Sequence, residues 1–503
     1  MNLSREEWAQ LGWETTIARD VVRLWKSTLD SRKIKKNSAF FAYDGLHHKG
    51  KDYIWQAIET GAGAVFLDKK YHKEVIKHSL FHKELPIFFS SNFFSDAAKT
   101  MYKLADLTIE DNQWVGVTGT NGKTTIAFVL EQIINALGKR TGYVGTLGAS
   151  LMGEIVNTIN TSPDPAMLSE IFQKGARKKI KTYVLEASSH GLDQGRLNSL
   201  PWEIAIFTNL SQDHLDYHQS MEKYFEAKKI LFNQLLNEAH PGATAIIIGE
   251  SPYGKRLYKE LGKSRPGLNL IGVGKNLECE ICEIKPGWDG YSFRLRYRDD
   301  ELLTIQSPLY GAFNVQNLSL AFLAARSMGF DASDIIRILT KVRPPPGRME
   351  VINLRDDAKA FIDYAHTPDA LENVILTLRE LSPRRIITIF GCGGDRDKKK
   401  RSVMAKVAQK FSDFVIATSD NPRNEDPAQI LKDVKKGLKG LHHVVIPERE
   451  LAIRTGVQLI GPKEILLVAG KGHENFQIIN DKKIHFSDKE HIIKSAKLLS
   501  KNE

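Results

Sequence analysis

A glycine-rich segment at residues 116–125, Gly-Val-Thr-Gly-Thr-Asn-Gly-Lys-Thr-Thr, carries residue types that can bind a nucleotide phosphate. Gly119 and Gly122 have no Cβ, so the backbone can approach a phosphate closely there. Lys123 is expected to contact the terminal phosphates, and the Thr124 hydroxyl is expected to hold Mg²⁺. The general phosphate-loop pattern places its first glycine at residue 117, which is a valine in this chain. The alternative interpretation is an ordinary tight turn.

The segments on either side of this loop favour phosphate binding over a plain turn. Residues 114–117 form a short apolar run that predicts a buried strand. Apolar residues then recur at helical spacing before Gly138: Ile126, Leu130, Ile133, Ile134 and Leu137. A strand, a glycine-rich turn and a helix start direct backbone N–H groups and the positive end of a helix dipole at one point. The predicted ATP-binding residues of this loop are Gly119, Thr120, Asn121, Gly122, Lys123, Thr124 and Thr125.

Polar clusters follow two later segments that the sequence predicts as strands, at 182–185 and 204–207. Glu186 opens the first cluster, and a carboxylate at a strand end near a nucleotide phosphate is a natural Mg²⁺ ligand. Residues 213–218 in the second cluster contain two His and two Asp, which is also compatible with zinc. Because Mg²⁺ prefers oxygen ligands and needs few of them when phosphates share the coordination, we favour a Mg²⁺–ATP site. The remaining alternative is a solvated polar loop at the edge of a sheet.

The elements that would position these residues alternate between strand and helix, which predicts an α/β protein. A chain of 503 residues is long enough for about three domains. We predict a small α/β domain at 1–111, a central domain with a mostly parallel sheet at 112–346 and a third α/β domain at 347–503. The proline run 344–346 is a stiff linker at the second boundary. The predicted strands are 38–42, 64–67, 86–89, 114–117, 141–144, 182–185, 204–207, 244–248, 361–362, 386–390, 414–417, 444–446 and 465–468, with antiparallel strands within 277–306.

Composition narrows the class of protein further. The chain is 42% hydrophobic and 26% charged, as in soluble globular proteins. No apolar run reaches the length of a membrane span, and the N-terminus lacks an apolar signal core, so we expect a cytoplasmic protein that does not bind a membrane. The net charge of +11 permits nucleic-acid binding, but it equally suits an enzyme that acts on anionic substrates. The basic residues are dispersed, and the one tight run, 398–401, is compatible with a solvated helix start.

Two further patterns are weak evidence for other cofactors. Cys279 and Cys282 have Cys-x-x-Cys spacing, but no second pair or nearby His accompanies them, and three cysteines cannot make a disulfide framework. The segment 391–396, Gly-Cys-Gly-Gly-Asp-Arg, follows a predicted strand but lacks the dinucleotide-binding fingerprint. We therefore expect no NAD site.

The loop at 118–125 resembles that of the Mur ligases of peptidoglycan synthesis and of their folylpolyglutamate synthase relatives. Further segments resemble signatures of the same family, and together they extend the resemblance over the whole chain: 186–192, 208–218, 311–317, 344–348, 363–368 and 420–423. The resemblance implies a UDP-binding N-terminal domain, a central P-loop ATPase-like domain and a Rossmann-like C-terminal domain. It also implies amide formation coupled to ATP cleavage, in which ATP phosphorylates a glutamyl carboxylate and an amine then attacks the acyl phosphate, with domain closure keeping water away.

The resemblance assigns roles to individual residues. The catalytic residues would be Lys123, Glu186, His214 and Lys228, with Mg²⁺ held by Thr124, Glu186, His214 and a carbamylated Lys228. Without the family, Lys228 would be interpreted as an exposed helical lysine. Contacts to ATP would also come from Asn314, Arg348 and Asp363, although Asn314 alone reads as a helix cap. The UDP-muramoyl substrate would be bound by Leu29, Ser31, Leu46, His47, His48, Asn160, Thr161, Ser162, Ser188, Gln194 and Arg196. Residues 29–32 alone indicate a capping turn, and His47 and His48 alone would be surface residues.

The segment Asp420-Asn421-Pro422-Arg423 resembles that of the Mur ligases that add meso-diaminopimelate. A guanidinium in a loop at a strand end can bind a carboxylate in a fork, although an Asn-Pro turn is the simpler interpretation. The diaminopimelate-binding residues implied are Arg396, Asp420, Asn421, Pro422, Arg423, Gly470 and Glu474. The partners implied are UDP-N-acetylmuramoyl-L-alanyl-D-glutamate, meso-2,6-diaminopimelate and ATP, with Mg²⁺ as cofactor and a monomeric enzyme. The alternatives are a lysine-adding Mur ligase, a folylpolyglutamate synthase-like enzyme, or a P-loop ATPase that binds nucleic acid.

Overall fold

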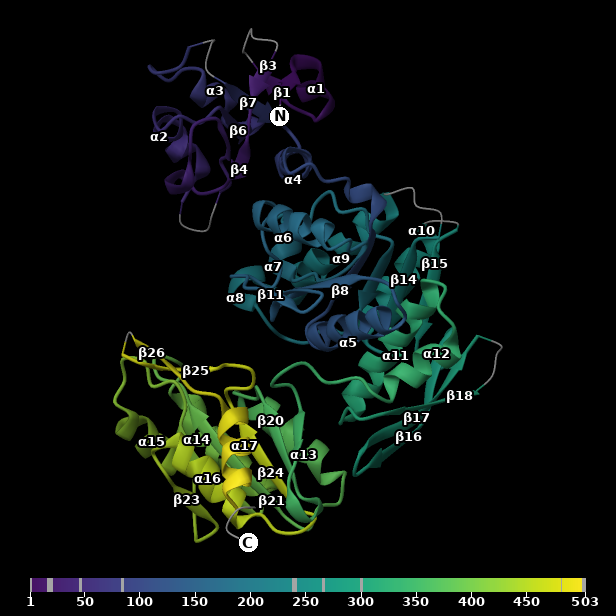
Figure 1. Cartoon of the computed structure of the whole chain (residues 1–503), viewed down its shortest axis with the longest axis vertical. Helices are drawn as coiled ribbons and strands as arrows, with labels where there is room; N and C mark the ends of the chain where they lie inside the picture. Colours follow the sequence, from purple (N-terminus) through teal and green to yellow (C-terminus); the bar gives the residue numbers. More distant parts are fainter. Residues whose placement is uncertain are drawn as a thin grey trace. The chain divides into compact units, whose positions relative to one another are not determined.

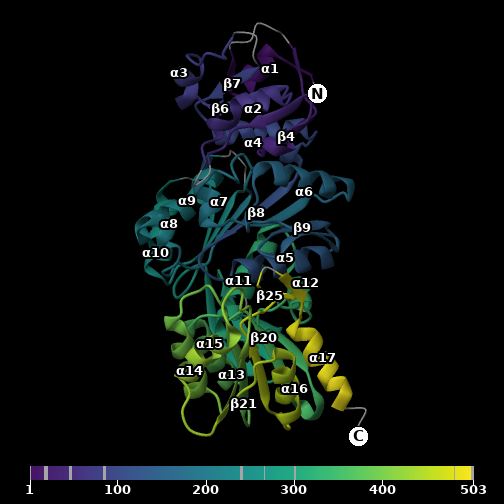
Figure 2. The same ribbon diagram turned by 90° about the vertical axis from the view of Figure 1, so that its left-hand side faces the viewer.

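The computed structural model describes residues 2–15, 21–44, 48–82, 86–237, 242–264, 267–298, 302–480 and 482–499. The chain forms two compact units, which are residues 1–280 with 320–331, and residues 281–319 with 332–503. Figures 1 and 2 draw the chain from two sides, coloured along the sequence. The mixture of largely parallel sheets with helices confirms the predicted α/β class. The domain boundaries at 111 and 346 stay a prediction.

The first unit begins with a sheet of strand order β2-β7-β6-β5-β4 (Figure 1). The strands are β2 (Glu14–Thr15), β7 (Ile87–Ser90), β6 (Ala64–Asp68), β5 (Ser38–Phe41) and β4 (Lys26–Thr28), beside a small pair of β1 (Asn2–Ser4) and β3 (Val21–Arg23). Helices α1 (Arg5–Gln10), α2 (Ile54–Glu59), α3 (His72–Val75) and α4 (Phe93–Leu104) accompany them. The predicted strands at 38–42, 64–67 and 86–89 are confirmed to within a residue at each end. Aromatic side chains fill the core on one face, among them Trp8, Trp13, Phe41, Phe66 and Phe88.

The same unit contains the first eight strands, in spatial order, of a larger sheet, and their order is β11-β10-β9-β12-β8-β13-β14-β15. Its strands are β8 (Gln113–Thr118), β9 (Thr141–Gly145), β10 (Gly148–Leu151), β11 (Glu154–Val156), β12 (Thr182–Glu186), β13 (Ile204–Phe207), β14 (Thr244–Ile248) and β15 (Asn269–Val273). Its helices are α5 (Lys123–Ala136), α6 (Pro165–Arg177), α7 (Ser189–Asp193), α8 (Leu215–His218), α9 (Met221–Asn237) and α10 (Pro252–Ser264). The strands from β9 to β15 in this order are parallel, as predicted, and β10 and β11 are added antiparallel. Strand β8, which leads into the glycine-rich loop, therefore lies between β12 and β13.

The second unit opens with antiparallel strands, as predicted for 277–306. Strand β16 (Cys279–Gly287) starts just before the unit, and β17 (Gly290–Tyr297) pairs antiparallel with β18 (Leu302–Ser307). Helix α11 (Ala312–Ser327) follows, and then α12 (Ala332–Leu339). The capping interpretation of Asn314 is wrong, because α11 begins at Ala312 and Asn314 lies inside its first turn.

The rest of the second unit is a sheet of order β19-β20-β24-β21-β22-β23, parallel except for β19. Its strands are β19 (Glu350–Asn353), β20 (Lys359–Asp363), β21 (Ile386–Cys392), β22 (Phe414–Ser419), β23 (His443–Val445) and β24 (Ile465–Ala469), with the pair β25 (Phe476–Ile479) and β26 (Lys482–His485). Its helices are α13 (Pro368–Arg379), α14 (Lys399–Phe411), α15 (Pro427–Lys435), α16 (Arg449–Leu459) and α17 (Asp488–Leu499). The predicted strands at 361–362, 386–390, 414–417, 444–446 and 465–468 are confirmed. This sheet places the loops after β21, β22 and β24 at one edge, because parallel strands share the direction of their carboxyl ends.

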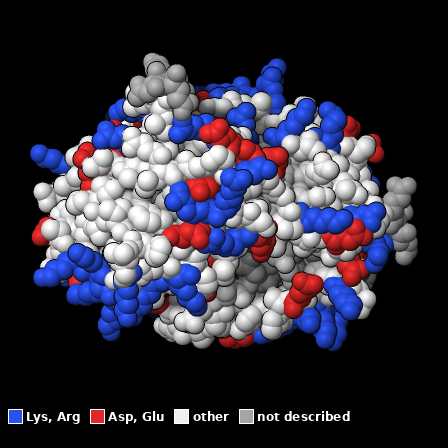
Figure 3. All heavy atoms as spheres, turned by 90° about the horizontal axis from the view of Figure 1, so that it is seen from below, with Lys and Arg blue, Asp and Glu red and all other residues white. Residues whose placement is uncertain are grey.

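The surface carries charges of both signs. On the face drawn in Figure 3, Lys and Arg side chains are interspersed with Asp and Glu. Within the described residues, no helix is both long and apolar enough to span a membrane.

Candidate active site

The glycine-rich loop joins β8 to α5 in the first unit, where the sequence predicts a phosphate site. Gly122 precedes α5 with a φ of +91°, and Gly119 has a φ of +142°. A Cβ on Gly119 would stand 1.8 Å from the Thr208 Oγ1 atom, so only glycine fits there. The loop is docked on the segment after β13, because the Thr120 N–H donates to the Asn209 carbonyl (2.9 Å) and the Asn121 N–H donates to Asn209 Oδ1 (3.0 Å). Thr208 and Asn209 thus hold the loop, although neither residue was predicted to have an individual role.

The side chains of Lys123 and Thr124 have different partners at this loop. The Lys123 ammonium donates to the carbonyls of Gly119 (2.9 Å) and Thr120 (2.8 Å). The Thr124 hydroxyl donates to Glu186 Oε2 at 2.9 Å. The predicted cation and the predicted carboxylate therefore both lie at the glycine-rich loop.

Glu186 ends β12 and is 1% exposed. Its carboxylate accepts hydrogen bonds from the Tyr143 hydroxyl, from the Thr146 N–H (2.9 Å) and hydroxyl (3.1 Å), and from Thr124. Tyr143 and Thr146 were not predicted as site residues; the one signal in the sequence is that Tyr143 lies in the predicted strand at 141–144 and Thr146 comes shortly after it. A buried carboxylate beside a threonine hydroxyl is a set of hard oxygen donors, which fits Mg²⁺.

Lys228 lies on α9, and the interpretation as an exposed helical lysine is wrong. It is 1% exposed, and its ammonium nitrogen donates to the Gly119 carbonyl at 2.8 Å. Burial, together with the nearby positive charge of Lys123, lowers the pKa of Lys228 well below its ordinary value. A lowered pKa favours the neutral amine, which is the form that can be carbamylated.

His214 precedes the short helix α8 in a left-handed conformation, with a φ of +51°. Its backbone N–H donates to Asp213 Oδ1 at 2.9 Å, and its ring centroid lies 4.8 Å from that of His190. Burial lowers the pKa of His190 and of His218, which also face this loop. Among the described residues, no group of three or more His, Cys, Asp or Glu side chains is arranged to hold a metal by itself.

Most of the residues predicted to bind the muramoyl peptide form one cluster beside Glu186. The Ser162 hydroxyl donates to the Glu186 carbonyl (2.8 Å) and lies 2.9 Å from the Ser188 hydroxyl. The Arg196 guanidinium donates to the Ser162 carbonyl (3.1 Å) and to Gln194 Oε1 (2.5 Å). Thr161 joins the cluster through the Thr146 hydroxyl at 3.2 Å, and Asn160 is exposed at its margin.

A cavity of about 850 Å³ lies in the same unit and is lined by Leu29 and Asn160, two residues predicted to bind the UDP-muramoyl substrate. Four lysines also line it: Lys26, Lys33, Lys35 and Lys36. The capping interpretation of residues 29–32 is confirmed, since Asp30 Oδ1 accepts from the Arg32 N–H at the start of the 3₁₀ turn Ser31–Lys33. His48 is exposed, with Nδ1 3.2 Å from the Tyr53 hydroxyl. Leu46 and His47 lie outside the described residues.

Three predicted ATP contacts belong to the second unit. Asp363 is buried, and its carboxylate accepts from the backbone N–H groups of Met349 and Ala365, each at 2.8 Å. Burial raises the pKa of this carboxyl. Arg348 places its guanidinium carbon 5.1 Å from the centre of the Tyr364 ring. The Asn314 side-chain amide donates to the Tyr310 carbonyl at 2.8 Å, so this amide is already hydrogen-bonded at the start of α11.

The residues predicted to bind diaminopimelate gather after β21, β22 and β24. The Asn421 amide donates to Glu474 Oε2 at 2.8 Å. A Cβ on Gly470 would stand 2.7 Å from Asp420 Oδ2, so these two loops touch. The Arg423 guanidinium donates to the Gly394 carbonyl at 2.8 Å, and Arg396 is exposed. A turn follows at residues 422–425, where the Glu425 N–H donates to the Pro422 carbonyl at 3.1 Å, while the Asn421 carbonyl accepts from the Gly394 N–H at 2.9 Å.

The fold is that of an α/β protein with a glycine-rich loop between β8 and α5 and a separate group of polar loops after β21, β22 and β24. Three family models match the chain: the Mur ligase family catalytic domain at 27–101, the Mur ligase middle domain at 117–325 and the Mur ligase glutamate ligase domain at 347–472. The chain belongs to the Mur ligase family.

Individual relatives agree with this assignment. The chain is 38% identical to a UDP-N-acetylmuramoyl-L-alanyl-D-glutamate–2,6-diaminopimelate ligase of Fusobacterium nucleatum, over 92% of this chain and 91% of that protein. It is similar to a solved structure of a ligase with the same name, at 31% identity and a TM-score of 0.72, over 95% of each chain. A folylpolyglutamate synthase structure from Mycobacterium tuberculosis, at 18% identity and a TM-score of 0.58, covers 75% of this chain and 92% of that one and shares the fold.

Replacing Gly119 with alanine is expected to lower the free energy of unfolding by about 3 kcal/mol or more, because the φ of +142° is strained for alanine and the Cβ meets the Thr208 hydroxyl. Gly138→Ala is the matched control, since Gly138 also has a positive φ but no atom within 4 Å of an added Cβ. That control should cost only about 1 kcal/mol. Urea denaturation of the two variants measures the difference, and equal losses would refute the tight docking of the loop.

Proposed function

We propose that this protein is an ATP-dependent ligase that adds meso-2,6-diaminopimelate to UDP-N-acetylmuramoyl-L-alanyl-D-glutamate. The observation that carries the proposal is the match, over nine-tenths of both chains, to a relative named for this reaction. The loop Asp420–Arg423 supports the same amino acid, because its buried carboxylate and its guanidinium suit a head group with an ammonium and a carboxylate.

The proposed chemistry follows from the poor reactivity of carboxylates toward amines. ATP phosphorylates the glutamyl side-chain carboxylate, the diaminopimelate amine attacks the acyl carbon, and phosphate leaves. Lys123 stabilises the negative charge on the transferring phosphoryl group, and the loop N–H groups orient the phosphates. Thr124 and Glu186 would hold Mg²⁺, which would neutralise phosphate charge. Lys228 is the candidate for carbamylation, because its buried position beside the loop favours the neutral amine.

Substrate binding is proposed to be divided among the loops. The cluster of Ser162, Ser188, Gln194 and Arg196 orients the muramoyl peptide, and the cavity lined by Leu29 and Asn160 holds the UDP end. Its lysines suit the negative charge of a diphosphate. Asp420, Asn421, Arg423 and Glu474 bind the amino acid. We further propose that the enzyme is cytoplasmic and monomeric and that it acts with Mg²⁺.

Phosphate release by the purified protein tests this function. With ATP, Mg²⁺ and UDP-N-acetylmuramoyl-L-alanyl-D-glutamate present, we expect release to depend on meso-diaminopimelate. Equal release with L-lysine would overturn the amino-acid assignment and favour a lysine-adding enzyme. Hydrolysis stimulated by DNA without any amino acid would favour the nucleic-acid-binding ATPase instead.

A further inference from the structure

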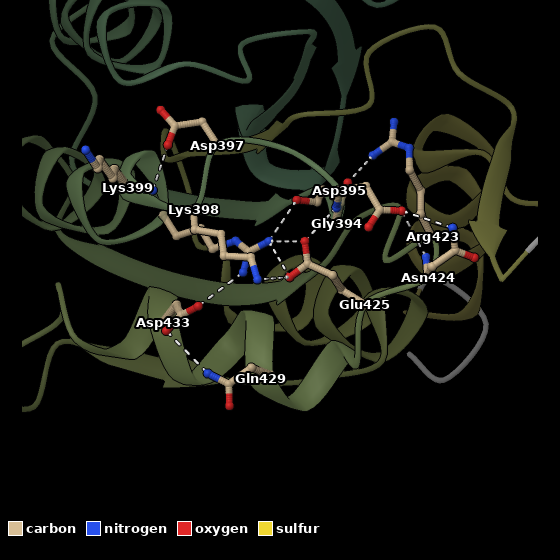
Figure 4. A network of polar contacts seen from close by, with 12 residues as sticks. Gly394, Asp395, Asp397, Lys398, Lys399, Arg423, Asn424, Glu425, Gln429 and Asp433 are labelled. Atoms are coloured by element: carbon tan, nitrogen blue, oxygen red, sulfur yellow. Dashed lines mark hydrogen bonds and ion pairs between the residues drawn. The ribbon is translucent and has the colours of Figure 1, made fainter.

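Two loops of the second unit carry the predicted diaminopimelate-binding arginines. Residues 393–398 follow β21 and contain Arg396, and residues 420–426 follow β22 and contain Arg423. Figure 4 shows the polar contacts that join them. The Gly394 N–H donates to the Asn421 carbonyl at 2.9 Å, and the Arg423 guanidinium donates back to the Gly394 carbonyl at 2.8 Å. The two loops therefore hold their shapes together.

Glu425 is the carboxylate at the centre of this junction. It lies in the second loop, and its Oε1 atom accepts from the Asp395 N–H of the first loop at 2.6 Å. Asp395 in turn accepts from the Asn424 amide at 3.2 Å (Figure 4). Asp395, which precedes Arg396, and Asn424, which follows Arg423, are thus joined to each other, and Asp395 is also joined to Glu425.

Arg401, on α14, holds Glu425 in place. Its side chain is 1% exposed, and its Nη2 donates to both Glu425 oxygens at 2.9 Å. Its Nη1 donates to Asp433 Oδ2 on α15 at 3.1 Å. The interpretation of 398–401 as a solvated helix start is therefore wrong for Arg401. The Arg401 guanidinium also lowers the pKa of Glu425, so the carboxylate stays charged and the pair stays intact near neutral pH.

There is a chemical reason why residue 401 must be an arginine. A planar guanidinium can bind one carboxylate with two hydrogen bonds and still reach a second, whereas a lysine ammonium is a point charge on a flexible chain. Removing one partner of a buried ion pair leaves the other without compensation, and the structure around it then shifts. Here the shift would pass through Glu425 to the Asp395 N–H and move the loop that carries Arg396.

We propose that Arg401 is a positioning residue for the amino-acid substrate: through Glu425 it fixes the two loops that present Arg396 and Arg423, without touching the substrate itself. This inference rests on the proposed function. It predicts that Arg401 sets the affinity for meso-diaminopimelate and its selection over L-lysine, because the two arginines must be held at a fixed separation to grip one molecule.

The test uses Arg401→Met, Arg401→Lys and Glu425→Gln, with Lys436→Met as the matched control. Lys436 contacts the same Asp433 at 2.7 Å, but it is 64% exposed and is paired with Asp433 rather than Glu425. We expect the first three variants to raise the KM for meso-diaminopimelate on the order of tenfold, as when the outer partner of a binding group is removed. The KM for ATP and for the UDP-muramoyl substrate should stay unchanged, and the control should behave as wild type. Glu425→Gln keeps the shape of the side chain and serves if the Arg401 variants fold poorly.

The outcomes separate this inference from the proposed function. A fall in kcat or in melting temperature without a change in the KM for meso-diaminopimelate would mean a structural role only and would overturn the inference. A wild-type enzyme whose phosphate release ignores meso-diaminopimelate would overturn the proposed function, and this inference with it. Faster hydrogen exchange at the Asp395 N–H in Glu425→Gln, but not in Lys436→Met, would support the route through Glu425 independently of catalysis.

Discussion

Lys123→Ala is expected to reduce ATP-dependent ligation by about 100- to 1000-fold, because it removes a preorganised cation from the transferring phosphoryl group. The Lys123 ammonium already lies over the loop, within 2.9 Å of the Gly119 carbonyl and 2.8 Å of the Thr120 carbonyl. The loop should keep its shape, since the Gly119 carbonyl still accepts from Lys228. Phosphate release with all three substrates measures the loss.

Lys223→Ala is the control for this variant. Lys223 lies on α9 in the same unit, is exposed, and contacts Gln219 at 2.8 Å within its own segment. It should ligate at the wild-type rate and melt at nearly the wild-type temperature. Ligation by Lys123→Ala at the unmodified rate would remove the basis for placing ATP at this loop.

Lys228→Met is expected to lose ligation by about 100-fold or more while making the protein more stable near neutral pH. Activity should fall because methionine cannot be carbamylated. Stability should rise because wild-type folding buries an amine whose pKa is lowered well below its ordinary value of 10.5, chiefly by burial. Methionine is similar in length and has no charge to desolvate.

The pH dependence of this gain has a definite sign. Between the lowered pKa of folded Lys228 and its unfolded value of 10.5, the unfolded chain binds more protons at this site. Wild-type stability from this group therefore rises with pH across that window. The stability advantage of Lys228→Met should be largest near neutral pH and shrink as the pH approaches about 10.

Urea denaturation at several pH values checks this expectation, with Lys229→Met as the control. Lys229 is the next residue on α9, but its ammonium is paired with Glu260 at 2.6 Å. Loss of this ion pair in Lys229→Met should lower the free energy of unfolding slightly at every pH and leave ligation intact. A Lys228→Met protein that is less stable than wild type near neutral pH would contradict the buried, neutral amine.

Lys228 and Lys229 are neighbours in the sequence but differ in burial, which illustrates what the sequence could predict and what it could not. The order of strands and helices was predicted because periodicity, glycines and polar residues at strand ends are local signals. Strands β1, β2, β3, β4, β10, β11, β15, β19, β25 and β26 were missed. They are short or have weakly apolar patterns, and pairing with a neighbouring strand decides whether such segments become strands.

The sequence by itself determined the glycine-rich loop, since Gly119, Gly122, Lys123 and Thr124 fall within six consecutive residues between an apolar strand and an apolar helix. It also determined, through motifs that resemble one family, which segments carry the remaining polar residues. Burial and pairing were decided only by the tertiary structure. Lys228 meets the Gly119 carbonyl across 109 residues of chain, and Arg401 meets Glu425 on the next loop. The physical reason is that a side chain's exposure and pKa depend on what packs around it, and those neighbours come from distant segments that no local pattern identifies.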